Sequence, residues 1–172
     1  PIATTSVSGV MSTAIFDEHT ANNAKNTSSN VYGDYIKLLI SDFATNKDGG
    51  NTKHGIGFDE TITDVSGDPI TNAYGIKVPN NATELYAFVS IPEGMKATHV
   101  EIFDKGDNLA VEVFETQINA ATMVSKNSGN CNTEFALAAN LNATATNQLA
   151  IKVTTTSVNN RIRGGRLKIA AQ

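Results

Sequence analysis

Apolar and polar residues alternate along three neighbouring runs in the middle of the chain, between Glu84 and Glu115. The apolar positions are Leu85, Ala87, Val89 and Ile91, then Val100 and Ile102, then Leu109, Val111 and Val113. A period of two places neighbouring side chains on opposite faces of a strand, so each run predicts a strand with one face on a core. The breaks at 91–94 and 105–108 contain Pro, Gly, Asp and Asn, which are typical of turns. The pattern therefore predicts an antiparallel meander of three strands.

The opposite faces of these runs are also partly apolar, because they carry Tyr86, Phe88, Phe103 and Phe114. A strand that is apolar on both faces is typical of a buried sheet. We therefore expect these strands to lie between two layers, or between the domain and a partner.

Further strand patterns lie on both sides of this region. They cover residues 58–62, 73–78, 117–124, 148–156 and 161–171, with loops at 45–57 and 126–133. Residues 134–145 fit a strand or a short helical turn. Residues 31–44 carry apolar residues at both helical and strand spacing, and the glycine-rich flanks favour a strand. Gly164 and Gly165 predict a bulge or a close backbone approach.

About eight strands at this spacing predict an all-β fold, an antiparallel β-sandwich of jelly-roll type. The 172 residues fit one domain, which we assign to residues 31–172, preceded by an extended N-terminal arm, residues 1–30. The arm is poor in large apolar groups and is not expected to fold alone. Its apolar residues are the predicted partner interface: Ile2, Val7, Val10, Met11, Ile15 and Phe16. The arm is expected to lie against its own sandwich, a neighbouring subunit or a larger assembly.

Charge and hydropathy narrow the possible partners. Only 17% of residues are charged, the net charge is −4 and the pI is about 5.3. This balance predicts no nucleic-acid partner. One basic cluster, Arg161, Arg163, Arg166 and Lys168, fits a solvated strand face or a local anion site. No run reaches the apolar length of a membrane span, and the N-terminus lacks the basic and apolar regions of a signal peptide. We expect no membrane partner, and a chain made in the cytoplasm.

Candidate chemistry is sparse. The single Cys131 cannot form an intramolecular disulfide, and His19, His54 and His99 do not lie at metal-ligand spacing. The loops at 46–51 and 104–108 offer oxygen ligands for calcium, but Asp, Asn and Gly are equally the residues of turns. There is no G-x-S-x-G motif. The sequence predicts no metal, no cofactor and no catalytic residue, and hence a protein that is not an enzyme. A hydrolase would need His54 or His99 beside a Ser and an acid.

Four segments carry a resemblance to a known class of protein: residues 85–103, 131–135, 147–157 and 163–169. Their pattern resembles small β-sandwich virion proteins of tailed bacteriophages. The resemblance covers less than half of the chain and implies a structural protein of the virion, with no catalytic residues.

Two functions are therefore expected. The first is a capsid decoration or knob protein that binds self or major capsid protein subunits through its arm and sheet edges, as a homo-oligomer or lattice component of the virion. The alternative is a carbohydrate-binding β-sandwich module. The absence of Trp, with Tyr32, Tyr35, Tyr74 and Tyr86 as the only tyrosines, speaks against the alternative.

Overall fold

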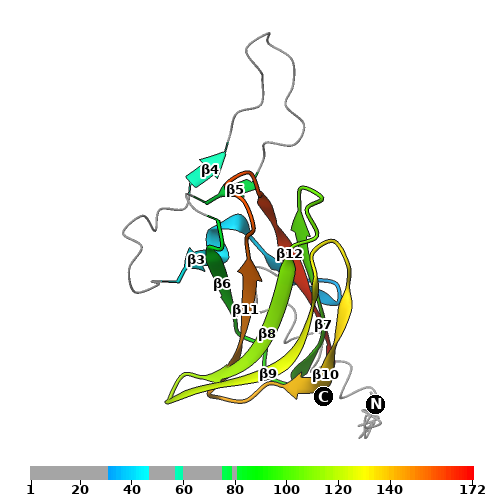
Figure 1. Cartoon of the computed structure of the whole chain (residues 1–172). Coiled ribbons are helices and arrows are strands. Elements are labelled where there is room, and N and C mark those ends of the chain that lie inside the picture. The colour runs from blue at the N-terminus through cyan, green and yellow to red at the C-terminus, as the bar shows by residue number, and fades with distance from the viewer. Residues whose placement is uncertain (1–30, 47–56, 60–74, 79–80) are drawn as a thin grey trace, which may run out of the picture.

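A computed structural model of the protein describes residues 31–46, 57–59, 75–78 and 81–172. Twelve strands and one short 3-10 helix lie in these ranges. In chain order they are β1 (Val31–Tyr32), β2 (Tyr35–Leu38), η1 (Ile40–Asp42), β3 (Phe43–Thr45), β4 (Gly57–Asp59), β5 (Gly75–Lys77), β6 (Glu84–Val89), β7 (Met95–Asp104), β8 (Ala110–Gln117), β9 (Ala120–Asn130), β10 (Phe135–Asn142), β11 (Asn147–Thr154) and β12 (Ile162–Ala171). The described residues are therefore all-β, as predicted (Figure 1).

The strands form two antiparallel sheets. One has five strands in the order β3-β6-β11-β8-β9. In the other, β7 lies between β10 and β12, and β12 continues to β2 and β1 and, at its first residue, to β5 and β4. The two sheets pack as a β-sandwich, which confirms the predicted fold class. The predicted arm, residues 1–30, lies outside the described residues.

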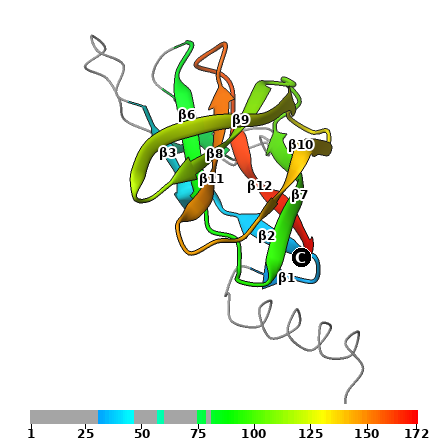
Figure 2. The same ribbon diagram turned by 90° about the horizontal axis from the view of Figure 1, so that it is seen from below.

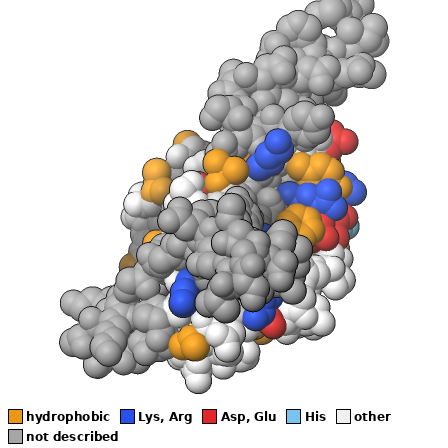
Figure 3. Space-filling model, turned by 90° about the horizontal axis from the view of Figure 1, so that it is seen from above, with side chains coloured by type: hydrophobic (Ala, Val, Ile, Leu, Met, Phe, Trp, Pro, Cys, Tyr) orange, Lys and Arg blue, Asp and Glu red, His pale blue; other side chains and the backbone are white. Residues whose placement is uncertain are grey.

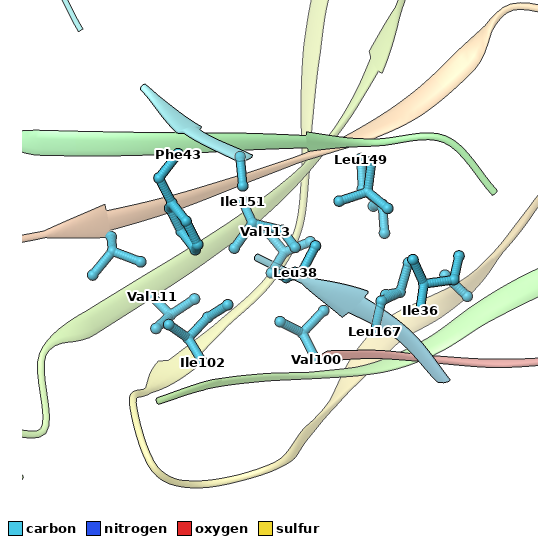
Figure 4. Packing of buried hydrophobic residues seen from close by; sticks show 14 of the residues in the cluster. Ile36, Leu38, Phe43, Val100, Ile102, Val111, Val113, Leu149, Ile151 and Leu167 are labelled. Atoms are coloured by element: carbon cyan, nitrogen blue, oxygen red, sulfur yellow. The ribbon is translucent and has the colours of Figure 1, made fainter. Parts of the chain in front are cut away.

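The core between the sheets contains the residues that the alternation placed on inward faces. Leu85, Val100, Ile102, Val111 and Val113 are fully buried. Figure 4 shows side chains from both sheets meeting, with Val111, Val113, Leu149 and Ile151 on one side and Val100, Ile102 and Leu167 on the other. Full burial of each large aliphatic side chain stabilises the fold by roughly 1.5–3 kcal/mol. The inward faces of the three central runs were therefore predicted correctly.

The predicted meander is wrong. Strands β6 and β8 lie in the same sheet but are separated by β11, and β7 lies in the opposite sheet. The connections after β6 and β7 therefore cross from one sheet to the other. The first contains the expected turn, in which the Met95 amide donates to the Pro92 carbonyl at 3.0 Å. Alternation defines only which face is buried, and it is the same for a hairpin and for an inter-sheet connection.

Other boundaries also differ from the prediction. Residues 31–44 form strands on both sides of the 3-10 turn η1, so the strand interpretation holds for most of them. Strand β9 continues to Asn130, through the predicted loop at 126–133. It does so because its register with β8 shifts twice, and such bulges let a polar, turn-like sequence stay paired.

Gly164 forms the predicted irregularity at the start of β12. The register between β12 and β7 shifts between Ile162 and Gly164, where Gly164 has φ +118°. A Cβ atom at Gly164 would lie 2.6 Å from the carbonyl oxygen of Leu38. Glycine is therefore required both by the backbone angle and by the close approach of β2.

Candidate functional site

A pocket of about 520 Å³ opens on the outer face of the five-stranded sheet. Its lining residues are Ala44, Thr45, Asn46, Tyr86, Phe88, Thr116, Gln117, Ala120, Ala121, Thr122, Met123 and Gln148. They come from all five strands, from the edge strand β3 to the opposite edge strand β9. A sheet whose two edges line one pocket must be concave on that face. The strong bend of the β8–β9 hairpin is visible in Figures 1 and 2.

An aromatic pair occupies the β6 side of the pocket. Tyr86 and Phe88 are two residues apart on one strand, so both point to the same face. Their ring centroids are 6.3 Å apart and the ring planes differ by 17°. Phe88 is 54% exposed, although it is large and apolar. Among the described residues no second layer of this chain covers Phe88, so the first of the two expected arrangements is wrong for this side chain. Cover by a partner stays a prediction.

Uncharged polar groups surround the aromatic pair. Gln148 lies next to Thr116 in the register of β11 and β8. Within the part of the chain that the structure describes, the Gln148 side chain makes no hydrogen bond, and the Thr116 hydroxyl is buried without a partner. Amide and hydroxyl groups can both donate and accept, so these two side chains keep hydrogen-bonding capacity for a ligand.

A hydrogen-bonded network holds the β6 side of the pocket in place. The Glu84 carboxylate accepts hydrogen bonds from the Asn46 side chain at 3.1 Å and from the Tyr86 hydroxyl at 3.2 Å, and pairs with Lys152 at 3.4 Å. Partial burial would raise the pKa of Glu84, but these hydrogen bonds and the Lys152 charge outweigh it, so the pKa lies below its ordinary value. Burial and the nearby Glu84 carboxylate raise the pKa of Tyr86. The ring therefore stays a neutral phenol that donates to Glu84.

The charged residues on the strands of this sheet pair with one another. Lys152 pairs with both Glu84 and Glu112, and Lys126 pairs with Glu115 at 2.7 Å. Contact with Glu112 raises the pKa of Lys152, and the hydrogen bond from Lys126 lowers the pKa of Glu115. None of these charged residues lines the pocket.

No other predicted candidate lines this pocket among the residues that the structure describes. The predicted partner residues Ile2, Val7, Val10, Met11, Ile15 and Phe16 lie outside the described residues, as does His54. His99 is on β7, between β10 and β12, and its ring bonds to the Thr98 hydroxyl at 3.0 Å. Within the described ranges no three His, Cys, Asp or Glu side chains gather in a metal-binding group.

Cys131 and the 104–108 loop are structural. Cys131 is buried against the core, and burial, together with the nearby Asp104 carboxylate, raises the pKa of its thiol far above the ordinary value. The Asp104 carboxylate accepts hydrogen bonds from the backbone amides of Gly106, Asp107 and Leu109. Its oxygens therefore stabilise the turn. This is the second of the two interpretations given for the 104–108 loop, a turn and not a calcium site.

The basic cluster on and immediately before β12 does not form one surface. Arg161 is buried and donates to the Val158 and Asn160 carbonyls. Arg166 pairs with Glu101 at 2.6 Å and lies 4.5 Å from the Tyr35 ring. In the end view of Figure 3, lysine and arginine side chains likewise lie in separate groups among other types. Three cations of this cluster, Arg161, Arg166 and Lys168, therefore contact groups of the protein itself.

One feature visible in the sequence belongs to this pocket, namely the aromatic alternate face of the run at 84–89. The amide and hydroxyl residues that complete the site are at positions 46, 116, 117, 122 and 148. They come from three strands, β8, β9 and β11, and from the residue that follows β3, and nothing in their spacing indicates that they meet.

Comparison with known proteins identifies no family. No family model and no curated protein matches this chain. One solved structure that aligns with it is the CBM36-1 domain of a multidomain xylanase from the hindgut metagenome of Trinervitermes trinervoides. That alignment covers 80% of this chain and 98% of the domain, with 14% identity and a TM-score of 0.41. The likeness is too low to bear on function. No helix in the described ranges has the length and apolar character of a membrane span.

Proposed function

We propose that the protein binds carbohydrate in the pocket on the outer face of its five-stranded sheet. The proposal rests on one observation: an aromatic pair, the half-buried Tyr86 and the exposed Phe88, lies beside amide and hydroxyl side chains in an open pocket of about 520 Å³. A sugar ring has an apolar face of C–H groups and a rim of hydroxyls. Aromatic rings contact the apolar face, while amides and hydroxyls exchange hydrogen bonds with the rim.

The size and character of the pocket support this proposal. Ligand pockets commonly measure about 300–1,000 Å³ and combine an apolar lining with a few polar groups. Met123, from β9, and Phe88, from β6, supply apolar contact on different strands. Gln148 and Thr116 supply hydrogen-bonding groups on the two strands between them. The lining thus offers both kinds of contact that a sugar requires.

Phe88→Ala is expected to weaken glycan binding by about tenfold or more, because it removes the most exposed ring of the pocket. The full chain would be screened on a glycan array, and each binder measured by isothermal titration calorimetry. Because Phe88 is outside the core, the variant should unfold within about 2–3 °C of wild type. Ile118→Ala is the matched control, since Ile118 is 69% exposed and does not line the pocket. A blank array, or binding unchanged in Phe88→Ala, would refute the proposal.

A second candidate function is the docking of protein subunits along β9. This eleven-residue strand is at the sheet edge, and its exposed apolar side chains include Met123 and Val124. A long exposed edge strand is a template for pairing with another chain. This observation supports the expected assembly role. The virion location and the contribution of residues 1–30 stay predictions, because the arm is outside the described residues.

Val124→Lys is expected to reduce self-association, because a charged side chain at an open edge opposes strand pairing. Sedimentation velocity over a range of concentrations would measure the oligomeric state of the full chain. Ile118→Lys adds the same charge at the neighbouring turn and serves as the control. If the wild type stays monomeric at every concentration, or if both variants behave alike, docking of a second copy along β9 is wrong.

A further inference from the structure

We infer that the pocket selects uncharged oligosaccharides and discriminates against both acidic and basic ones. This inference rests on the proposed carbohydrate-binding function and specifies its ligand class. The first observation is the lining itself. Every described residue that lines the pocket is uncharged, and its polar members are Thr45, Asn46, Tyr86, Thr116, Gln117, Thr122 and Gln148.

The second observation is the state of the nearby charges. The five strands of this sheet carry five charged residues: Glu84, Glu112, Glu115, Lys126 and Lys152. Each of them is in an ion pair with another member of the set. Lys152, the cation nearest to the aromatic pair along the sheet, has a side chain that is only 16% exposed and is shared between two carboxylates. Neither lysine is available to an acidic ligand unless an existing pair breaks.

The balance of these charges opposes an anion further. Three carboxylates and two ammonium groups leave one net negative charge on the strands that form the pocket. A carboxylate moved from water into this pocket would lose hydration without gaining a cationic partner. A cationic sugar would also lose hydration, and it would gain little ion pairing because Glu84 and Glu112 already share Lys152. An uncharged sugar avoids both penalties, and its hydroxyls match the free amide of Gln148.

Matched pairs of oligosaccharides test this inference directly. The first pair is cellohexaose and the same hexasaccharide with its primary hydroxyls oxidised to carboxylates. The second is the hexamer of N-acetylglucosamine and its cationic deacetylated form. Calorimetry on the full chain is expected to give at least about tenfold tighter binding for the neutral member of any pair that binds. The signal should be lost in Phe88→Ala, which places it in the pocket.

Gln148→Lys provides the gain-of-function arm. It places an ammonium group in the pocket, at a side chain with no hydrogen bond among the described residues. The variant is expected to narrow or reverse the preference for the neutral member of the cellohexaose pair. Gln148→Met, which is similar in size and uncharged, should keep the preference and serves as the control.

The possible outcomes separate this inference from the function on which it rests. If a charged member binds as tightly as its neutral counterpart and Phe88→Ala removes that binding, carbohydrate binding stands and the preference for uncharged ligands is refuted. The same conclusion follows if Gln148→Lys leaves the preference unchanged. If no glycan binds, on the array or in either pair, the proposed function fails and the inference fails with it.

Discussion

Replacing Asp104 with Ala is expected to lower the free energy of unfolding by about 3–5 kcal/mol. Asp104 is 3% exposed and closes the connection between β7 and β8. One oxygen accepts from the amides of Gly106 and Asp107 at 2.6 and 3.0 Å, and the other accepts from Leu109 at 3.0 Å. Asn132 donates to the same carboxylate. The substitution leaves these donors without an acceptor, and unsatisfied donors in a buried site are costly.

Urea denaturation would measure the loss, with the slope of the transition checked for two-state behaviour. Asp107→Ala is the matched control from the same turn. Asp107 is exposed and its carboxylate accepts one side-chain bond, from Asn160 at 2.8 Å. We expect the control to lose about 1 kcal/mol. Similar losses in the two variants would show that the Asp104 carboxylate does not organise the inter-sheet connection.

Gly164→Ala is expected to destabilise the protein by more than about 3 kcal/mol, enough to remove much of the 5–15 kcal/mol of a typical domain. Two effects combine at this position. The backbone has φ +118°, which side chains rarely adopt, and the new methyl group would lie 2.6 Å from the Leu38 carbonyl oxygen. To remove the clash with the Leu38 carbonyl, β2 would have to move away from β12, and this movement would disturb the pairing of the two strands.

Gly106→Ala separates the two effects. Gly106 has φ +112°, close to that of Gly164, but a methyl group there would meet nothing within 4 Å. The control should therefore lose only the backbone term, about 1–3 kcal/mol. Thermal and urea unfolding of both variants would measure the difference. Equal losses would mean that β2 gives way easily and that close packing at Gly164 is unimportant.

The sequence predicted the buried face of most strands, because a strand with one buried face shows alternating apolar and polar residues. Leu149, Ile151 and Val153 alternate along β11 and all are fully buried. Along β12, Leu167 and Ile169 follow the same alternation and are buried, but Ala171, the next residue in the series, is exposed at the end of the strand. Burial ends with the sheet, and alternation does not mark that point.

Strand pairing could not be predicted in the same way. Strand β11 inserts between β6 and β8, although it begins 30 positions after the end of β8. The runs at 84–89 and 110–117 have the same local pattern whether they pair with each other or with β11. Which strand each run pairs with depends on how the connections cross between the sheets, and on the fit of side chains across the core.

The candidate site was predicted only in part. The aromatic side chains of Tyr86 and Phe88 stood out in the sequence, but they were expected to be covered. Their exposure results from the five-stranded sheet, whose concave outer face has no described layer over it. Gln148 and Thr116 join the site through the register of β11 with β8, which no local pattern specifies.

The sequence by itself determined the all-β class, the inward faces of the central strands and the irregularity at Gly164. Each of these follows from local physics, namely the period of two in a strand and the backbone freedom of one residue. The tertiary structure alone decided which strands are neighbours, which sheet each belongs to and where a pocket opens. Those properties depend on contacts between residues far apart in the chain, and here such contacts bring five separate strands to one concave surface.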